Sequence, residues 1–323
     1  MNIKFSARDL ASATFAILLI AGLCADARAA STPVSSCGTL SPAGNYILTK
    51  NLTATGNCLV IAAANVAIDM NGKTITGNGT GSGITDDGSE RDFSIITNGK
   101  IRDFATGINL ANSGEGIISN VDSSVNTGEG VFIAQCCNTL DAVSANSNGD
   151  TGIVLASDDS SLSNIQANGN GGGGIAITRC CNTLVDSTVS NNTGAGMFFA
   201  DGDNFVVGSK FQKNTGDGIS TQGDDNGVTT SSTSHNGGDG MSLSEDDMVA
   251  ASKSNGNGGS GIDYGGSRFG DLSGVKANNN TTNGVNMDCR ASTASLSAKN
   301  NGGGNVVQTV SDGPCANVNL KAP

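Results

Sequence analysis

The sequence predicts an all-β fold, a single parallel β-helix in which each coil contributes three short strands. Three observations predict it. A glycine followed by Ile, Val or Met recurs at steps of 21 to 23 residues, and an asparagine stands four residues before most of these glycines. All four prolines lie outside residues 43–313. A continuous ladder of paired strands excludes proline, because proline has no N–H to donate.

The repeated glycine marks the coils. Its members are Gly107, Gly130, Gly152, Gly174, Gly196, Gly218, Gly240, Gly261 and Gly284. The asparagine column consists of Asn126, Asn148, Asn170, Asn192, Asn214, Asn236, Asn257 and Asn280, and Asn300 keeps the same offset from Gly304. Such a period predicts roughly ten to twelve stacked coils. We expect the asparagine to occupy a left-handed turn and to hydrogen-bond to its equivalent in the next coil.

Each coil contains three segments in which apolar residues alternate with polar ones. The first and third residues after the glycine are mostly apolar, as in Val131 and Ile133. A second apolar column lies ten residues after the glycine, as at Leu140, and a third includes Val143 and Ala145. Alternation of this kind indicates short strands with one buried face.

The N-terminus has the pattern of an export signal. Lys4 and Arg8 precede an uncharged apolar run from residue 11 to residue 23, and Ala27-Arg28-Ala29 fits a small-x-small cleavage site. The run is shorter than the roughly 20 apolar residues that span a bilayer. We therefore expect cleavage after Ala29, export to the periplasm or beyond, and no membrane span in the mature chain.

The repeat divides the chain into four parts. The predicted signal peptide covers residues 1–29, and residues 30–82 form an N-terminal cap with the first coils. The regular coils cover residues 83–306, and residues 307–323 form a C-terminal cap.

Two units carry a resemblance to a known superfamily. They read Asn-Thr-Gly-Glu-Gly-Val at residues 126–131 and Asn-Thr-Gly-Asp-Gly-Ile at residues 214–219. Together with the stretch 65–77, they resemble the right-handed parallel β-helix repeats of the pectin-lyase-like superfamily. The resemblance covers residues 37–320 and implies a right-handed coil. It leaves the function open, because the superfamily includes lyases, hydrolases, epimerases, adhesins and accessory proteins.

Eight of the nine cysteines follow the predicted cleavage site, and an even number in an exported protein predicts disulfides. We expect one bridge at each end of the molecule, Cys37–Cys58 and Cys289–Cys315. The adjacent pairs Cys136-Cys137 and Cys180-Cys181 are two coils apart, about 9.6 Å, which is too far for a bridge between them. Each is expected to form a vicinal disulfide, with paired thiolates for a metal as the alternative.

The turn after the first strand gathers carboxylates. Asp203, Asp225 and Asp247 are expected to stack at the strand spacing of about 4.8 Å. The set that we call the acidic ridge consists of Asp203, Asp224, Asp225, Asp246 and Asp247. A bound Ca²⁺ would relieve their repulsion. The alternative is that Asp simply suits turns and that solvent screens the charges.

The same carboxylates are the candidate catalytic residues. Asp203, Asp225 and Asp247 offer pairs at about 5 Å, a separation that suits glycoside hydrolysis, and Arg268 is the candidate base for a calcium-dependent lyase. Of the polygalacturonase motifs that the resemblance implies, only Asp-Asp occurs, and the Asp-Pro-His-Asp motif of alginate epimerases is absent. The only histidine, His235, is expected to be a surface residue.

An apolar strip is expected on the outer side of the first strands. It consists of Phe132, Val154, Ala176 and Phe198. Contiguous exposed apolar residues usually mark contacts, so we expect a binding or self-association surface unless a loop covers it.

These features favour an exported, non-catalytic module that binds a polysaccharide or a cell-surface partner through the strip and the acidic ridge. The alternative is a polysaccharide lyase or glycoside hydrolase that uses the ridge and Ca²⁺, the one cofactor expected. A net charge of -12 argues against nucleic-acid binding. A homo-oligomer could form through the strip.

Overall fold

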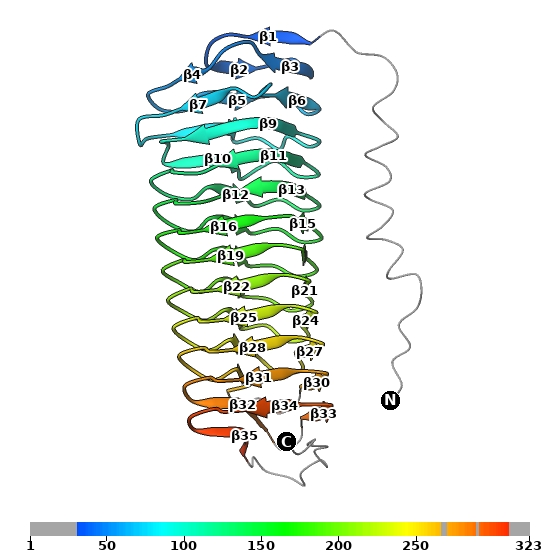
Figure 1. Ribbon diagram of the computed structural model, residues 1–323. Helices are drawn as coiled ribbons and strands as arrows, with labels where there is room; N and C mark the ends of the chain where they lie inside the picture. The colour runs from blue at the N-terminus through cyan, green and yellow to red at the C-terminus, as the bar shows by residue number, and fades with distance from the viewer. Residues whose placement is uncertain (1–30, 266–269, 289–290, 310–323) are drawn as a thin grey trace.

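A computed structural model describes residues 31–265, 270–288 and 291–309 of the chain. These residues form a parallel β-helix whose coils stack in one column (Figure 1), as the sequence predicts. None of the described residues lies in a helix that could cross a membrane. The predicted signal peptide, Arg268, Cys289 and Cys315 lie outside the described residues.

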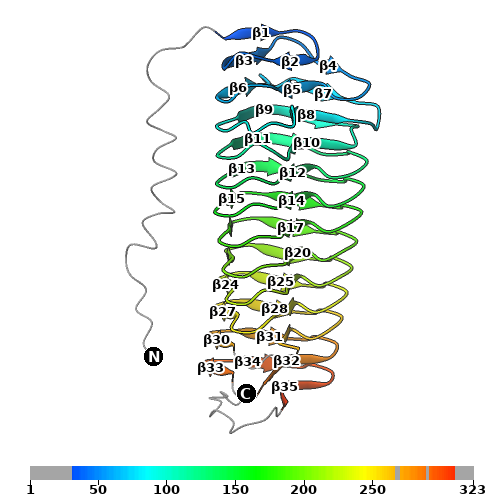
Figure 2. The same ribbon diagram turned by 180° about the vertical axis from the view of Figure 1, so that it is seen from behind.

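A 13-stranded parallel sheet forms one wall of the column, with one strand from each coil. We call it the first sheet. Its strands are β2 (Gly38–Leu40), β5 (Leu59–Ile61), β8 (Ser82–Asp86), β10 (Thr106–Leu110), β12 (Val131–Ile133), β14 (Ile153–Leu155), β17 (Ile175–Ile177), β20 (Met197–Phe199), β23 (Ile219–Thr221), β26 (Met241–Ser242), β29 (Ile262–Asp263), β32 (Asn283–Asp288) and β35 (Gly304–Thr309). Figure 2 shows β12, β14, β17 and β20 stacked along this wall.

A 22-stranded sheet forms the other two walls, which we call the second and third rows. The second row consists of β1 (Thr32–Val34), β3 (Gly44–Leu48), β6 (Val66–Asp69), β9 (Ile95–Arg102), β11 (Ile117–Ser123), β13 (Thr139–Ser144), β15 (Ser161–Ser163), β18 (Thr183–Val185), β21 (Phe205–Val207), β24 (Gly227–Thr229), β27 (Met248–Ala250), β30 (Asp271–Ser273) and β33 (Ser292–Ala294). The third row consists of β4 (Leu52–Thr53), β7 (Thr74–Thr76), β16 (Gln166–Asn168), β19 (Thr188–Ser190), β22 (Lys210–Gln212), β25 (Ser232–Ser234), β28 (Lys253–Asn255), β31 (Lys276–Asn278) and β34 (Ser297–Lys299). The longer strands β9, β11 and β13 run from the second row into the third.

The core is a continuous column of the predicted inward side chains. Val131, Ile133, Leu140, Val143 and Ala145 are all fully buried. Each stacks on its equivalent in the neighbouring coil, as Val131 does on Ile153, because strands pair in register along the axis. Period-2 alternation therefore places one set of side chains inside and leaves the other set outside.

The asparagine column forms a buried hydrogen-bond ladder at the corner before the first sheet. Asn170, for example, donates its backbone N–H and its Nδ2 to Asn192 Oδ1, both at 2.9 Å. The left-handed residue is the one before each asparagine of the column; Asn191, with φ 58°, precedes Asn192. The prediction that the column asparagine itself is left-handed is therefore wrong. In the last coil the ladder residue is Asn301 rather than Asn300, which is itself left-handed.

The repeated glycine is required by this ladder. A Cβ at Gly152 would lie 2.7 Å from both the Nδ2 of Asn170 and the carbonyl oxygen of Gly174. Both contacts are closer than real Cβ atoms allow, so a side chain here would displace the ladder of the next coil. The glycine and the asparagine thus recur together because they pack against each other.

The other two corners have ladders of their own. After the first strand, Asn182 Oδ1 accepts from the backbone N–H of Ser160, and Asn204 Oδ1 accepts from Asn182. After the second strand, serine hydroxyls are the acceptors. The Ser209 hydroxyl, for example, accepts from the backbone N–H of Ser187. Where the chain bends, buried backbone N–H groups have no partner in the strand ladder. These side chains accept hydrogen bonds from them instead.

Candidate functional site

The outer face of the first sheet carries the predicted apolar strip. Phe132, Val154, Ala176 and Phe198 are paired in register in four successive coils, and each is half-buried. The same column continues as Ser220, Ser242 and Asp263. One straight face therefore changes from apolar to hydroxyl to carboxylate along the axis.

A groove of about 440 Å³ lies where the apolar part of this face meets the polar part. Its lining includes Ala176, Phe198 and Ser220 from the strands and Thr151, Ala195 and Asp217 from the edge where the strands begin. An aromatic ring, a methyl group, hydroxyls and a carboxylate thus face one open space.

Asp217 lines this groove, and Asp239 and Asp263 belong to the next two coils; we call these three residues the groove acids. Asp217 and Asp239 stand directly before the glycines that open β23 and β26. Asp217 Oδ1 accepts from the backbone N–H of Asp239 at 2.7 Å, and Asp239 Oδ1 accepts from that of Ser260 at 2.5 Å. Asp263 Oδ1 accepts from Asn286 Nδ2 at 3.0 Å. Backbone N–H groups of adjacent coils therefore hold Asp217 and Asp239, and an amide side chain of the next coil holds Asp263.

The pKa values of Asp239 and Asp217 are raised. Partial burial raises the pKa of Asp239 to about 6. The hydrogen bond from Ser260 lowers this pKa, and the nearby charges of Asp263 and Asp217 raise it further. Burial also raises the pKa of Asp217, with a further contribution from Asp263. A carboxyl group that titrates near neutrality can exchange a proton under physiological conditions.

The sequence analysis missed the groove acids because it followed the turn after the first strand rather than the residue before it. The sequence does contain a signal. An aspartate precedes the repeated glycine in two successive units, at Asp217 and Asp239, where other coils have Thr151, Gly173 and Ala195. Register then adds Asp263, which lies in the next coil.

The acidic ridge differs from its prediction at Asp247. The turn after β26 is one residue shorter than its neighbours, since Gly227 pairs with Met248 at a separation of 21 residues. Asp246, with φ 57°, therefore takes the left-handed position that Asp225 and Asp203 occupy in the coils before it. The predicted stacking of Asp247 on Asp225 is wrong.

Asp247 instead closes the corner ladder. Its side chain is 1% exposed, and its Oδ1 accepts from the backbone N–H of Asn226 at 2.7 Å. Its Oδ2 accepts from the Thr221 hydroxyl and from the backbone N–H of Ser244. Burial raises the pKa of Asp247, opposed by these hydrogen bonds. A carboxylate enclosed in this way cannot reach a substrate or a hydrated cation.

The rest of the ridge lies at the surface. Desolvation and the negative charges of Asp246, Asp203 and Asp224 raise the pKa of Asp225. Within the described ranges, however, no three His, Cys, Asp or Glu side chains are placed to hold a metal ion. Calcium binding at the ridge stays a prediction. The catalytic role given to Asp203 and Asp225 likewise stays a prediction.

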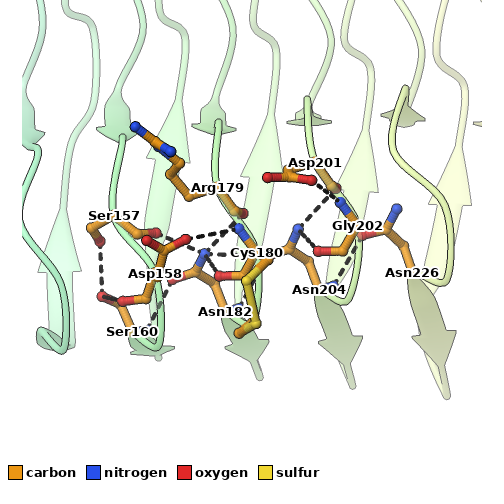
Figure 3. The surroundings of a disulfide bond; sticks show 11 residues. Ser157, Asp158, Ser160, Arg179, Cys180, Asn182, Asp201, Gly202, Asn204 and Asn226 are labelled. Atoms are coloured by element: carbon orange, nitrogen blue, oxygen red, sulfur yellow. Dashed lines mark hydrogen bonds between the residues drawn. A yellow bond between two sulfur atoms is a disulfide. The ribbon is translucent and has the colours of Figure 1, made fainter.

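Three predicted disulfides are present. Cys37–Cys58 joins the starts of β2 and β5, and Cys136–Cys137 and Cys180–Cys181 are vicinal. Asp158 lies between the vicinal pairs. Its backbone oxygen accepts from Cys137 N at 2.9 Å. Its Oδ1 accepts from Cys180 N at 3.2 Å (Figure 3). The two vicinal disulfides follow β12 and β17, which belong to the strands of the apolar strip.

The sequence matches the family described as right handed beta helix region over residues 129–282 and 173–313, together more than half of the chain. The chain belongs to this family. The coil is therefore right-handed, as the resemblance to the pectin-lyase-like superfamily implies. No curated protein sequence matches the chain.

Solved structures share the architecture. The Dettilon tailspike protein superposes with a TM-score of 0.59 at 13% identity, over 78% of this chain and 62% of that one. The A-module of the Azotobacter vinelandii mannuronan C-5 epimerase AlgE4 gives 0.54 at 14% identity, over 83% and 91%. The periplasmic alginate epimerase AlgG gives 0.52 at 10% identity, over 79% and 74%. Likeness at these identities shows the fold alone.

Proposed function

We propose that this protein is an exported binding module for a linear, neutral polysaccharide, which lies along the outer face of the first sheet. The observation that carries the proposal is the groove in which Phe198 and Ala176 adjoin Ser220 and Asp217. The predicted signal peptide supports export, and the glycan could belong to a cell surface.

The chemistry of the groove suits a sugar ring. The C–H face of a pyranose is apolar and packs on an aromatic ring, whereas its rim of hydroxyls needs donors and acceptors. Phe198 offers the ring, and Asp217 and Ser220 offer the polar groups. Equivalent positions recur at about 4.8 Å along the axis, so an extended chain can contact several coils.

The groove acids favour a neutral glycan. Asp217, Asp239 and Asp263 place negative charge along one end of the face, and the whole chain carries a net charge of -12. A carboxylated polymer would be repelled there. A hydroxyl-rich neutral polymer would instead donate hydrogen bonds to these carboxylates, and charge-assisted hydrogen bonds of this kind are strong.

The test is retention of the mature protein in gels that contain neutral polysaccharides such as β-glucan, xylan or mannan. We expect Phe198→Ser to weaken binding by roughly tenfold or more, the loss of one aromatic contact. Phe205→Ser is the matched control, because Phe205 is 41% exposed on the second row, away from the groove. No retention on any neutral glycan, or equal losses in the two variants, would exclude the proposed face.

A second candidate function, glycoside hydrolysis, rests on Asp239. With a pKa of about 6, its carboxyl group could act as a general acid. A groove acid one coil away would be about 5 Å distant, the separation of a retaining pair. Reducing sugar released by the wild type but not by Asp239→Asn, with binding retained, would favour this function over binding alone.

A further inference from the structure

The outer face of the third row differs from the rest of this acidic molecule. Its segments 209–214, 231–236, 252–257, 275–280 and 296–301 contain no Asp or Glu. They contain five lysines and the only histidine. We call the set Lys210, Lys213, His235, Lys253, Lys276 and Lys299 the lysine face.

The lysine face is built by register. Lys253 stands directly opposite Lys276 in the adjacent coil, and Lys210 occupies the same column two coils before Lys253. All of these side chains are exposed. A parallel column two residues along the strands presents amides and a hydroxyl at Gln212, Ser234, Asn255 and Asn278, followed by Lys299. The face is therefore a straight row of cations beside a row of hydrogen-bonding groups.

These lysines have no acidic partners in the described structure. The ion pairs found among the described residues involve Arg91, Lys100 and Arg102. Lys100 belongs to an earlier coil of the same wall, and there Asp122 lies 3.9 Å from it. Acidic residues thus accompany the cations in the early coils and are missing from the later ones.

Like charges at directly opposed positions of neighbouring strands destabilise a sheet. Lys253 and Lys276 occupy such positions although the chain has 29 acidic residues that could separate or neutralise them. An anionic ligand would remove the repulsion that the fold leaves in place. Lys253 and Lys276 are one strand spacing of about 4.8 Å apart along the axis, and Lys210 is two spacings from Lys253.

We propose that the lysine face binds a linear carboxylated polysaccharide that runs along the helix axis. A polymer with one carboxylate per sugar presents charges in a regular row, and its hydroxyls suit the amide column. Apart from His235, the face offers no aromatic side chain on which nucleobases could stack. It also offers no apolar side chain that could insert into a membrane. The site is on a different wall from the groove and does not depend on the function proposed above.

The test uses polygalacturonate in EDTA, so that calcium cannot bridge it to the acidic ridge. Binding is measured by titration calorimetry at two salt concentrations. We expect Lys253→Gln with Lys276→Gln to weaken binding by about tenfold or more and to reduce its salt dependence, because fewer counterions are released. Lys50→Gln with Lys73→Gln makes the same change in net charge in the first coils and should leave binding unchanged.

The outcomes separate this proposal from the first one. Phe198→Ser should weaken neutral-glycan binding and leave polygalacturonate binding intact. Absence of polygalacturonate binding, or equal binding by the two lysine variants, would overturn the proposal. Binding confined to single-stranded DNA or to vesicles containing phosphatidylserine would also overturn it, in favour of a different polyanion.

Discussion

At the scale of single residues, Asp247 has a structural role that its neighbours in the sequence do not share. Asp247→Asn turns its amide N–H₂ toward the backbone N–H of either Asn226 or Ser244, so one of these buried donors loses its carboxylate acceptor. We expect this to lower the free energy of unfolding by about 2 kcal/mol, the cost of buried donors that lose their acceptor. Denaturant unfolding would measure it.

The matched control is Asp225→Asn, one coil away. Asp225 lies at the surface among repelling carboxylates. Its neutralisation should leave stability unchanged or raise it slightly. Equal effects of the two substitutions would contradict the assignment of Asp247 to the ladder.

Asp239 links stability to pH. Its pKa is raised from 3.8 to about 6 in the folded protein, so the folded state holds this proton more tightly than the unfolded chain does. Its contribution therefore favours folding most at low pH and is lost as the pH rises from about 4 to about 6. Asp239→Asn should flatten this part of a plot of Tm against pH, whereas Asp271→Asn, on the second row, should not. An unchanged slope in Asp239→Asn would contradict the raised pKa.

At the scale of structural elements, the asparagine ladder joins neighbouring coils. Asn192 is 1% exposed, accepts from Asn170, and donates to Ala167 O and Asn214 Oδ1. Asn192→Ala would leave the buried N–H of Asn170 without an acceptor. We expect a loss of stability on the order of 3 kcal/mol, measured by chemical denaturation.

The adjacent Asn191 provides a control within the same turn. Asn191 is left-handed and exposed, so Asn191→Gly should leave stability nearly unchanged, because glycine adopts a positive φ without strain. A larger loss of stability in Asn191→Gly than in Asn192→Ala would mean that the asparagine ladder does not stabilise this corner.

At the scale of the whole molecule, coils contact only their neighbours, so the ends are the weakest part of the stack. Cys37–Cys58 links the first two strands of the first sheet across 21 residues, a loop whose closure stabilises by about 3 kcal/mol. Cys37→Ser with Cys58→Ser should speed hydrogen exchange in β2 and β5 while β17 and β20 keep their protection. Cys136→Ser with Cys137→Ser, which opens a bridge within a single turn, should change neither region. If Cys37→Ser with Cys58→Ser lowered protection equally in all of these strands, the stack would unfold as one unit.

The whole molecule also separates its charges by wall. The groove acids border the first sheet, the acidic ridge follows it, and the lysine face occupies the third row. A net charge of -12 describes none of these surfaces. Two walls with opposite charge can serve two kinds of ligand without competition.

Much of this could be predicted from the sequence alone. The spacing of Gly130 and Asn126 predicts the coil, because a solenoid repeats its local interactions in every unit, and period-2 alternation predicts the inward column at Val131 and Ile133. The vicinal disulfides also follow from spacing, since two coils separate them by more than a bridge can span. The register of the apolar strip follows from the same period.

Only the tertiary structure decided which acidic residues face solvent. One residue fewer in a single turn moves Asp247 from the ridge into the ladder, and periodic spacing does not reveal where in a coil a residue is lost. The groove acids and the lysine face likewise depend on contacts between coils that are about 22 residues apart in the chain. Local periodicity determines the fold, whereas pKa shifts, the groove and the separation of charge arise from the packing of one coil on the next.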